Sequence, residues 1–526
     1  MTIPRAALLL CLVASTAGAQ SAFVQVLRGD TVVVEKFTRT PTRLDVTIAA
    51  KGAGLQLLTS ELGPTGAFGA ITLTVLPPGA PATGTPMLKA QASIHGDTAI
   101  AIIERGGAPQ TQRIPSQAGA QPVIANLVSH IETMLIAVRR TNAPTATITT
   151  FSIINGATAA LQFTNLLNDS VTVLIGGGSL FVITDSTGRI VRGGSLDGAL
   201  VFNRVDGVAV TKLGFAKPNY SAPAGAPYTA ESVVVPTALG HTLGGTFTKP
   251  TDVTTALPVV ISISGSGPQD RDEYISIVRN GYRLFRQVAD TLGRRGVAML
   301  RMDDRGVGES GGSFATATSR DFANDIRAAV TWLRSRSDVD PSRIFLVGHS
   351  EGGMIAPMVA ADDPLLAGIV LMAGTGRTGR EILLFQNRYA IEYDTSLTSA
   401  KRATMLARVA RSVDSALTTS PWLTFFGAHD PIATARRVKV PVLILQGADD
   451  QQVIASEASL LGKAFRAGGN RDVTMQVFPE LNHFFIRQPG GNPSGYSELP
   501  TNLASSEVLG MAADWIARRA SRIATP

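Results

Sequence analysis

Two patterns of hydrophobic and polar residues divide the chain. From about residue 21 to residue 216, short runs alternate apolar and polar positions and are separated by Gly, Pro and Asn-Asp turns. Alternation with a period of two is typical of antiparallel strands that bury one face. From about residue 228, continuous apolar runs are followed by stretches of helical period, which is typical of a parallel sheet covered on both faces. We therefore predict a β-rich antiparallel N-terminal domain and then an α/β domain.

The first region is predicted to hold strands and one packed helix. A helical stretch is predicted over residues 122–139, where apolar residues recur at intervals of three and four. A Pro-, Gly- and Ser-rich segment at 217–227 predicts a linker. The domains are thus expected at 21–216 and 228–526. The alternating runs are residues 23–27, 31–35, 43–48, 70–75, 98–103, 170–175 and 180–184.

The second region alternates predicted strands and helices. About 70 residues separate the apolar runs at 368–372 and 442–445, far more than a plain connection needs. They are mostly helical in pattern and rich in Arg, so we predict a helical cap at about 377–435 whose arginines face solvent. The other predicted strands are 259–263, 297–302, 344–347 and 473–477, and the predicted helices include 282–295, 320–336 and 503–518.

The N-terminus has the pattern of a secretory signal peptide. Arg5 precedes an apolar run at 6–14, and an Ala17-Gly-Ala19 site follows. We expect cleavage after residue 19 and an exported protein, periplasmic or extracellular. The single cysteine, Cys11, lies in the segment to be removed, so the mature chain is expected to have no disulfide, thiolate nucleophile or cysteine metal site.

Composition narrows the classes of partner. The formal charge is +7, and the basic residues are scattered without a run of the kind that binds nucleic acid. No stretch of about 18 apolar residues occurs beyond the N-terminus, so no transmembrane segment is expected. The chain lacks a P-loop, an H-E-x-x-H motif and a calcium loop, so no cofactor is predicted. The β-rich domain carries no catalytic motif and is a candidate for contact with lipid, the envelope or a partner.

The strongest chemical motif is Gly348-His349-Ser350-Glu351-Gly352. It lies between an apolar strand and a helix-compatible stretch, which is the context of a nucleophile elbow, where glycines allow the sharp turn that exposes the hydroxyl. A second G-x-S-x-G match at 308–312 runs into Gly-Ser-Phe with no helix beginning there. We therefore take Ser350 as the nucleophile and Ser310 as part of a structural turn.

A serine hydroxyl needs a base, and the base needs an orienting carboxylate. In folds that carry such a nucleophile elbow, the chain order of the triad is Ser, then acid, then His. His483 follows the last apolar run, whereas His429 lies late in the predicted cap, so His483 is preferred. Two adjacent carboxylates, Asp449 and Asp450, follow the strand at 442–445. Both remain candidates for the acid, with Asp450 preferred.

The oxyanion hole is expected to use two backbone N–H groups. One is that of Glu351, directly after the nucleophile. The other is expected from the loop that follows the strand at 259–263, where small residues allow close approach. Ser266 is the first choice and Gly267 the second. The side chain of Glu351 is not expected to be catalytic.

Five motifs of this region are jointly specific. They are Gly265-Ser-Gly-Pro-Gln-Asp-Arg-Asp272, Asp304-Arg-Gly-Val-Gly-Glu-Ser310, Gly348-His-Ser-Glu-Gly352, Gly447-Ala-Asp-Asp-Gln-Gln-Val453 and Asn482-His483. Together they resemble secreted bacterial α/β-hydrolases of the esterase type, close to the serine-aminopeptidase-like and dienelactone-hydrolase-like branches. The resemblance implies an α/β-hydrolase fold, hydrolysis of small carboxylic esters and Asp450 as the triad acid. For the first 225 residues there is only a fold-level similarity to curved-sheet lipid-carrier domains.

Parts of the sequence are compatible with three other functions. Gly374-Thr-Gly-Arg-Thr-Gly379 fits a dinucleotide-binding pattern, but no second strand ending in an acid follows it, so these glycines are predicted to form the hinge into the cap. A serine peptidase or a thioesterase could use the same triad. A non-catalytic exported binding protein with a hydrolase fold is the remaining alternative.

Overall fold

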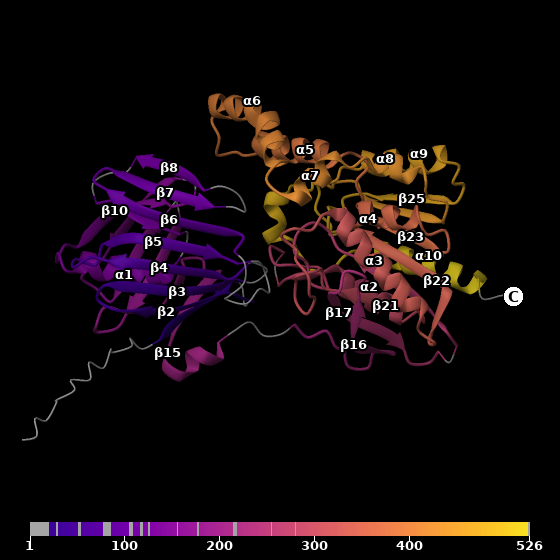
Figure 1. Ribbon diagram of the computed structural model, residues 1–526, viewed down its shortest axis with the longest axis horizontal. Helices are drawn as coiled ribbons and strands as arrows, with labels where there is room; N and C mark the ends of the chain where they lie inside the picture. The colour runs from indigo at the N-terminus through magenta and orange to yellow at the C-terminus, as the bar shows by residue number, and fades with distance from the viewer. Residues whose placement is uncertain are drawn as a thin grey trace, which may run out of the picture. The chain divides into compact units, whose positions relative to one another are not determined.

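The computed structural model describes residues 20–27, 30–50, 54–76, 86–104, 109–115, 119–124, 127–154, 156–175, 178–213, 218–253, 255–278 and 280–523. The predicted signal peptide, 1–19, lies outside the described residues. The chain divides into two compact units, residues 1–76 with 82–216 and residues 77–81 with 217–526, which Figure 1 colours from indigo to yellow. None of the described helices has the length and apolar character needed to span a membrane.

Unit 1 is built on one large sheet. Its described strands pair in the order β8-β7-β6-β5-β4-β3-β2-β1-β15-β14-β13-β12-β11-β10-β9, antiparallel except for β9 with β10. The strands are β1 (Ser21–Leu27), β2 (Asp30–Arg39), β3 (Arg43–Ala50), β4 (Gln56–Leu62), β5 (Phe68–Val75), β6 (Leu88–His95), β7 (Thr98–Glu104), β8 (Gln110–Pro115), β9 (Gln121–Val123), β10 (Thr145–Ser152), β11 (Thr158–Thr164), β12 (Ser170–Ile175), β13 (Gly178–Thr184), β14 (Ile190–Ser195) and β15 (Leu200–Asp206).

The sheet of unit 1 curves until its two edges approach each other. The edge strands β8 and β9 are joined by six chain steps, which span at most about 21 Å. A flat sheet of this width would hold them about 67 Å apart. The amide oxygen of Gln121 on β9 accepts a hydrogen bond from the N–H of Phe68 on β5 at 2.6 Å, so the far side of the sheet does reach this edge.

One helix, α1 (Val128–Arg139), packs into the core of unit 1, and a short 3-10 helix, η1 (Gly207–Lys212), follows β15. The N-cap residue of α1, Leu127, supplies no side-chain cap. Glu35 on β2 caps the helix instead, because its carboxylate accepts from the N–H groups of Val128 and Ser129 at 3.0 and 2.8 Å. Burial raises the pKa of Glu35 to about 7, and burial lowers the pKa of His130 to about 3.

The predicted helix over residues 122–139 is wrong at its start. Residues 121–123 form β9, which pairs with β10, and the helix begins only at Val128. Ile124 extended the apolar period of three and four into this segment, but the backbone of residues 121–123 pairs with β10 at the sheet edge. The β-rich, mainly antiparallel character predicted for this region is confirmed.

Unit 2 contains an eight-stranded mixed sheet in the order β16-β17-β21-β18-β22-β23-β24-β25. The pairs from β21 to β25 are parallel, whereas β16 and β17 run antiparallel at one edge. The strands are β16 (Tyr228–Pro236), β17 (Thr242–Pro250), β18 (Leu257–Ile263), β21 (Ala298–Met302), β22 (Val339–His349), β23 (Gly368–Met372), β24 (Val442–Gly447) and β25 (Val473–Phe478), with a separate hairpin of β19 (Tyr274–Ile275) and β20 (Tyr282–Arg283).

Helices cover both faces of this sheet. Along β18, Val259 and Ile261 belong to one hydrophobic cluster, and Val260 between them belongs to the other. The first cluster is covered by α3 (Ser319–Arg334), α4 (Glu351–Ala360), α8 (Pro431–Ala435) and α9 (Ser456–Ala467), and the second by α2 (Leu284–Gly293) and α10 (Ser506–Ile523). A sheet of this order with helices on both faces is an α/β-hydrolase fold, as predicted. The two antiparallel edge strands were not predicted.

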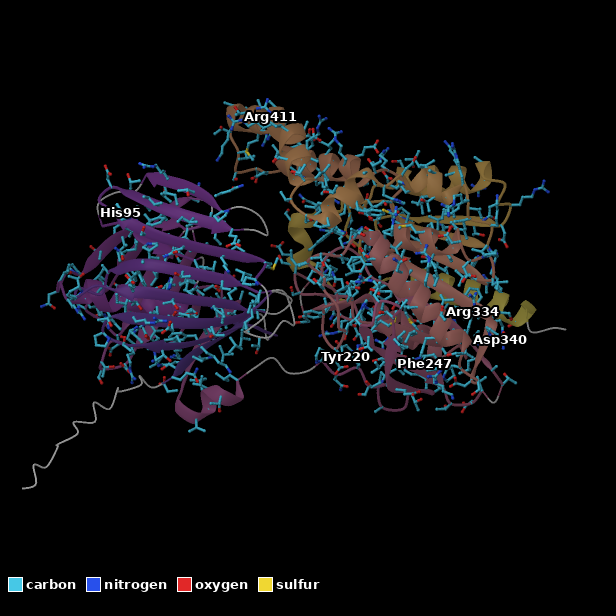
Figure 2. The ribbon with its side chains drawn as sticks, viewed as in Figure 1. His95, Tyr220, Phe247, Arg334, Asp340 and Arg411 are labelled. Atoms are coloured by element: carbon cyan, nitrogen blue, oxygen red, sulfur yellow. The ribbon has the colours of Figure 1, made fainter. Side chains whose placement is uncertain are left out.

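Between β23 and β24 the chain forms a group of helices. They are α5 (Gly379–Glu392), α6 (Ser399–Ala416), α7 (Pro421–Ala428) and α8. Figure 1 shows α5, α6 and α7 together at one side of unit 2. Arg411 on α6 is exposed at the surface (Figure 2). After β25 a short 3-10 helix, η2 (Pro493–Glu498), precedes α10.

Candidate active site

Ser350 lies on a strained turn between β22 and α4. Its backbone angles are φ 54° and ψ −116°, a region that residues other than glycine rarely occupy. A Cβ atom at Gly348 would overlap the carbonyl of Gly352, and one at Gly352 would overlap the carbonyl of Ile263. The flanking glycines are therefore required by close backbone packing, and the turn presents the Ser350 hydroxyl at the carboxyl end of the sheet.

The structure brings His483 and Asp450 together. His483 Nδ1 lies 2.8 Å from Asp450 Oδ2, and both side chains are buried. The other carboxylate oxygen of Asp450 accepts from the N–H groups of Gln452 and Val453 at 2.8 and 2.9 Å. Asp449 is only half-buried, and its backbone N–H donates to the Leu481 carbonyl at 3.0 Å. Of the two adjacent aspartates, Asp450 faces the imidazole.

Ser350 and His483 line the same cavity, which has a volume of about 220 Å³. No hydrogen bond joins the two side chains among the described residues, which is common before a substrate is bound. The rest of the lining is mainly apolar and amide side chains. It includes Ile275, Ile382, Leu383, Gln386, Trp422, Phe426, Gln452, Val453 and Phe484.

Ser266 and Glu351 both line the cavity, and neither backbone N–H donates a hydrogen bond among the described loops and turns. Their side chains are joined, because the Ser266 hydroxyl donates to Glu351 Oε2 at 2.7 Å. The N–H of Gly265 is already taken by Glu273 at 2.8 Å. Gly267 adopts φ 98°, which leaves the loop free to turn. The first-choice pair of donors thus lies on adjacent, linked segments.

The carboxylate of Glu351 is a structural junction. Besides Ser266, it accepts from the Ser319 hydroxyl at 2.6 Å and from Trp422 Nε1 at 2.9 Å. Trp422 belongs to α7, and Ser319 begins α3. The side chain therefore ties the elbow to the loop after β18 and to the helices between β23 and β24.

A second carboxylate, Glu273, contacts the elbow from the other side. Its Oε1 lies 2.8 Å from His349 Nδ1, and His349 Nε2 lies 3.1 Å from the carbonyl of His483. Burial lowers the pKa of His349, but the charge and hydrogen bond of Glu273 outweigh it, and the net pKa is raised. Both side chains are buried.

The side chain of Asp304 holds the loop after β18 through two hydrogen bonds. The Ser264 hydroxyl and the Gln269 N–H donate to its two oxygens at 2.8 and 3.0 Å. Burial raises the pKa of Asp304 well above its usual range. These two hydrogen bonds tie both ends of the segment from Ser264 to Gln269 to one side chain.

The other sequence candidates have different surroundings. Ser310 donates to the Asp303 carbonyl at 2.7 Å and accepts from the Gly244 N–H at 3.0 Å, which is a turn contact. His429 caps the end of α7 beside Thr434, away from the cavity that Ser350 lines.

Close packing explains why glycine stands at positions 374, 376 and 379. A Cβ at Gly353 would come within 2.6 Å of the Cα of Gly374, so this pair lets α4 approach the end of β23. The N–H of Gly376 donates to Glu457 at 2.8 Å, and a Cβ at Gly379 would overlap Phe426. The described residues contain no group of His, Cys, Asp and Glu arranged to hold a metal ion.

Sequence reasoning did not single out Trp422 or Glu273. Glu273 directly follows the motif at 265–272, and its backbone φ of 55° has no sequence signal. Trp422 stands after a Ser-Pro helix start, which indicated a helix but not which face would point at the elbow.

Comparisons with known proteins agree with this architecture. Residues 280–489 match the family of serine aminopeptidases, S33. Esterase EstD of Thermotoga maritima is 28% identical over 238 residues, which is 44% of this chain and 56% of that protein. Dipeptidyl aminopeptidase BIII of Pseudoxanthomonas mexicana is 27% identical over 237 residues, 44% of this chain and 31% of that protein. The chain thus spans about half or less of these curated relatives. The family match and these relatives support an α/β hydrolase.

The chain also shows similarity to solved structures. An esterase of Pyrococcus furiosus, Pf2001, has a TM-score of 0.38 and 17% identity, covering 58% of this chain and 97% of its own. A putative dienelactone hydrolase of Klebsiella pneumoniae has a TM-score of 0.36 and 16% identity, covering 55% of this chain and 99% of its own.

Proposed function

We propose that this protein is a serine hydrolase that cleaves small carboxylic esters, with Ser350 as nucleophile, His483 as base and Asp450 as the orienting acid. The observation that carries the proposal is the strained elbow at Ser350 facing the same cavity as an imidazole bonded to a buried carboxylate. This combination is the one that acyl transfer by serine requires.

The proposed mechanism is a two-step acyl transfer. His483 removes the proton of Ser350 as the hydroxyl oxygen attacks the ester carbonyl carbon. The Asp450 carboxylate, 2.8 Å from His483 Nδ1, holds the tautomer in which Nε2 can accept that proton. The N–H groups of Ser266 and Glu351 stabilise the oxyanion. His483 then protonates the leaving alcohol, and water repeats the sequence on the acyl-enzyme to release the acid.

The polar groups of the cavity favour an ester over an N-terminal peptide bond. Recognition of a free ammonium needs an available carboxylate, but Glu273 and Glu351 are only 1% and 3% exposed and are engaged internally. No Lys or Arg belongs to the described lining, so a substrate carboxylate has no partner there. An uncharged acyl group is therefore preferred, and a volume below that of drug-sized pockets favours a short one.

The helices between β23 and β24 serve as a cap in this proposal. Ile382, Leu383 and Gln386 on α5 and Trp422 and Phe426 on α7 supply one wall of the cavity. Excluding bulk water on this side would strengthen the oxyanion contacts. We also propose that the protein acts outside the cytoplasm, on the basis of the signal-peptide pattern at residues 1–19.

A p-nitrophenyl ester series from acetate to palmitate tests the proposal. The wild type is expected to hydrolyse the short esters fastest, and Ser350→Ala to lose turnover while keeping its circular dichroism spectrum. Ser310→Ala is the matched control and is expected to retain activity. Aminoacyl p-nitroanilides and acyl thioesters assayed in parallel address the peptidase and thioesterase alternatives. Near-normal ester turnover by Ser350→Ala would overturn the assignment.

A further inference from the structure

We propose that Glu273 and His349 form a buried ionic pair that positions the catalytic segments and tunes the base, so that both are positioning residues of the reaction. This inference rests on the proposed function. It concerns two side chains that neither attack the substrate nor belong to the triad, but that contact the segments carrying Ser266, Ser350 and His483.

Three segments meet at this pair. Glu273 Oε1 accepts from the N–H of Gly265, which precedes the oxyanion donor Ser266, at 2.8 Å. The same oxygen lies 2.8 Å from Nδ1 of His349, which precedes Ser350. His349 Nε2 then reaches the main-chain carbonyl of His483 at 3.1 Å. One carboxylate and one imidazole therefore fix the loop after β18, the elbow and the histidine loop relative to one another.

The local backbone is built for this contact. Glu273 holds a left-handed φ of 55°, which is uncommon for a residue with a side chain and is retained when surrounding contacts enforce it. A Cβ at position 265 would come within 2.9 Å of Glu273 Oε1 and 3.2 Å of the Ser350 Cβ. Glycine at 265 is thus what lets the carboxylate reach the N–H beside the elbow.

The hydrogen bonds indicate where the protons lie. A main-chain carbonyl only accepts, so His349 Nε2 carries a hydrogen toward His483. As a carboxylate, Glu273 accepts at Oε1 from Gly265 N–H and from His349 Nδ1. Both ring nitrogens of His349 are then protonated, and the pair is an imidazolium with a carboxylate. The raised pKa of His349 agrees with this assignment.

The positive end of this pair faces the catalytic base. The rings of His349 and His483 are 4.8 Å apart between centroids, whereas Glu273 reaches His483 only through His349. The charge of the pair that lies next to His483 is therefore that of His349, and removing it is expected to change how the rate depends on pH. The other titratable groups around the two rings are Asp450, Glu351, Tyr282 and Tyr496, and none of them changes in the variants below.

The test uses Glu273→Gln in the full chain, with Glu457→Gln as the matched control. Glu457 is likewise buried, accepts from a glycine N–H at 2.8 Å and pairs with a cation, Arg377, but it does not line the cavity. Two readouts are needed: kcat and KM on a short p-nitrophenyl ester, and the pH dependence of the rate at which a fluorophosphonate modifies Ser350. The second readout requires no knowledge of the substrate.

Glu273→Gln is expected to lower kcat by about 10- to 100-fold with little change in KM, because misplaced catalytic groups cost rate more than binding. The acid limb, which is the fall in the modification rate at low pH, should move up by about half a pH unit or more. The reason is that the variant pair no longer places a positive charge beside His483. His349→Gln, which can still donate to the His483 carbonyl, should move the limb in the same direction. It serves as the test if Glu273→Gln does not fold.

The outcomes separate the two proposals. If the wild type is not modified at Ser350, the proposed function fails. If the wild type is modified and the variant keeps the same acid limb and the same kcat, the positioning pair is wrong. A loss of thermal stability shared by Glu273→Gln and Glu457→Gln, with an unmoved acid limb, would show a structural role only and would also overturn it.

Discussion

Replacing Asp450 by Asn tests the geometry around His483 in detail. One carboxylate oxygen of Asp450 accepts two backbone N–H groups, from Gln452 and Val453, while the other faces His483 Nδ1 at 2.8 Å and Gln446 Nε2 at 3.1 Å. In the variant the amide oxygen must remain with the two N–H groups, because they can only donate. The amide NH₂ then points at His483 Nδ1 and favours the tautomer with its hydrogen on Nε2.

That tautomer cannot accept the proton of Ser350. A comparable loss of the tautomer-setting carboxylate in serine proteases lowers kcat by about 10⁴-fold, which corresponds to about 5.5 kcal/mol in activation free energy. We expect a loss of this order in Asp450→Asn, measured as kcat on p-nitrophenyl butyrate at pH 7.5. Asp449→Asn, one residue away, is the control and is expected to stay within about twofold of the wild type. Wild-type turnover in Asp450→Asn, or the large loss in Asp449→Asn instead, would refute the reasoning.

Other variants test the cavity, the packing and unit 1. Trp422→Ala should shift the ester preference toward longer acyl chains, because the indole is part of the cavity wall; an unchanged chain-length profile would contradict this. Gly353→Ala should lower the free energy of unfolding by about 1–3 kcal/mol, because its Cβ would press on Gly374. Urea unfolding followed by tryptophan fluorescence measures this change, because all three tryptophans lie in unit 2. Glu35 has a raised folded pKa, so folding takes up a proton there and stability falls as pH rises from about 4.5 to about 7. Glu35→Gln should therefore gain up to about 3 kcal/mol relative to the wild type across that window, followed by far-UV circular dichroism. Burial lowers the pKa of His130 to about 3, so the wild type loses stability as pH falls below about 6.5 and the unfolded chain takes up a proton. The free energy of unfolding of His130→Phe should therefore rise relative to that of the wild type as pH falls below about 6.5.

Much of the architecture follows from periodicity alone. The parallel strands around Ser350 are buried on both faces and appear as continuous apolar runs, and the alternating runs of unit 1 each bury one face. The edge strands β16 and β17 were missed because one is only partly covered and the other is rich in Gly and Thr, so neither shows a continuous apolar run. The helix start at Val128 was missed because its cap comes from Glu35, about 90 residues earlier in the chain.

In the candidate site too, some features follow from the local sequence and others depend on distant contacts. Motif and chain order single out Ser350 and His483, because glycine spacing and fold order are local features of the sequence. The two adjacent aspartates are distinguished in the sequence only by resemblance to the family motif, whereas the folded loop turns Asp450 toward the imidazole. The contacts of Glu273 depend on a left-handed backbone and on three distant segments, which no short pattern encodes.

The strand order of unit 1 has a consequence for its synthesis. Two meanders meet at the β1–β15 pair, which joins residues about 185 positions apart, such as Ser21 and Asp206. Until the ribosome has released the last strand, β1 has only β2 as a neighbour and its other edge is unpaired. Such an edge is a template for pairing with other chains, and closing so distant a contact is slow. The nascent protein is therefore most exposed to aggregation before residue 206 emerges, and a chain truncated just before β15 would keep that edge open permanently.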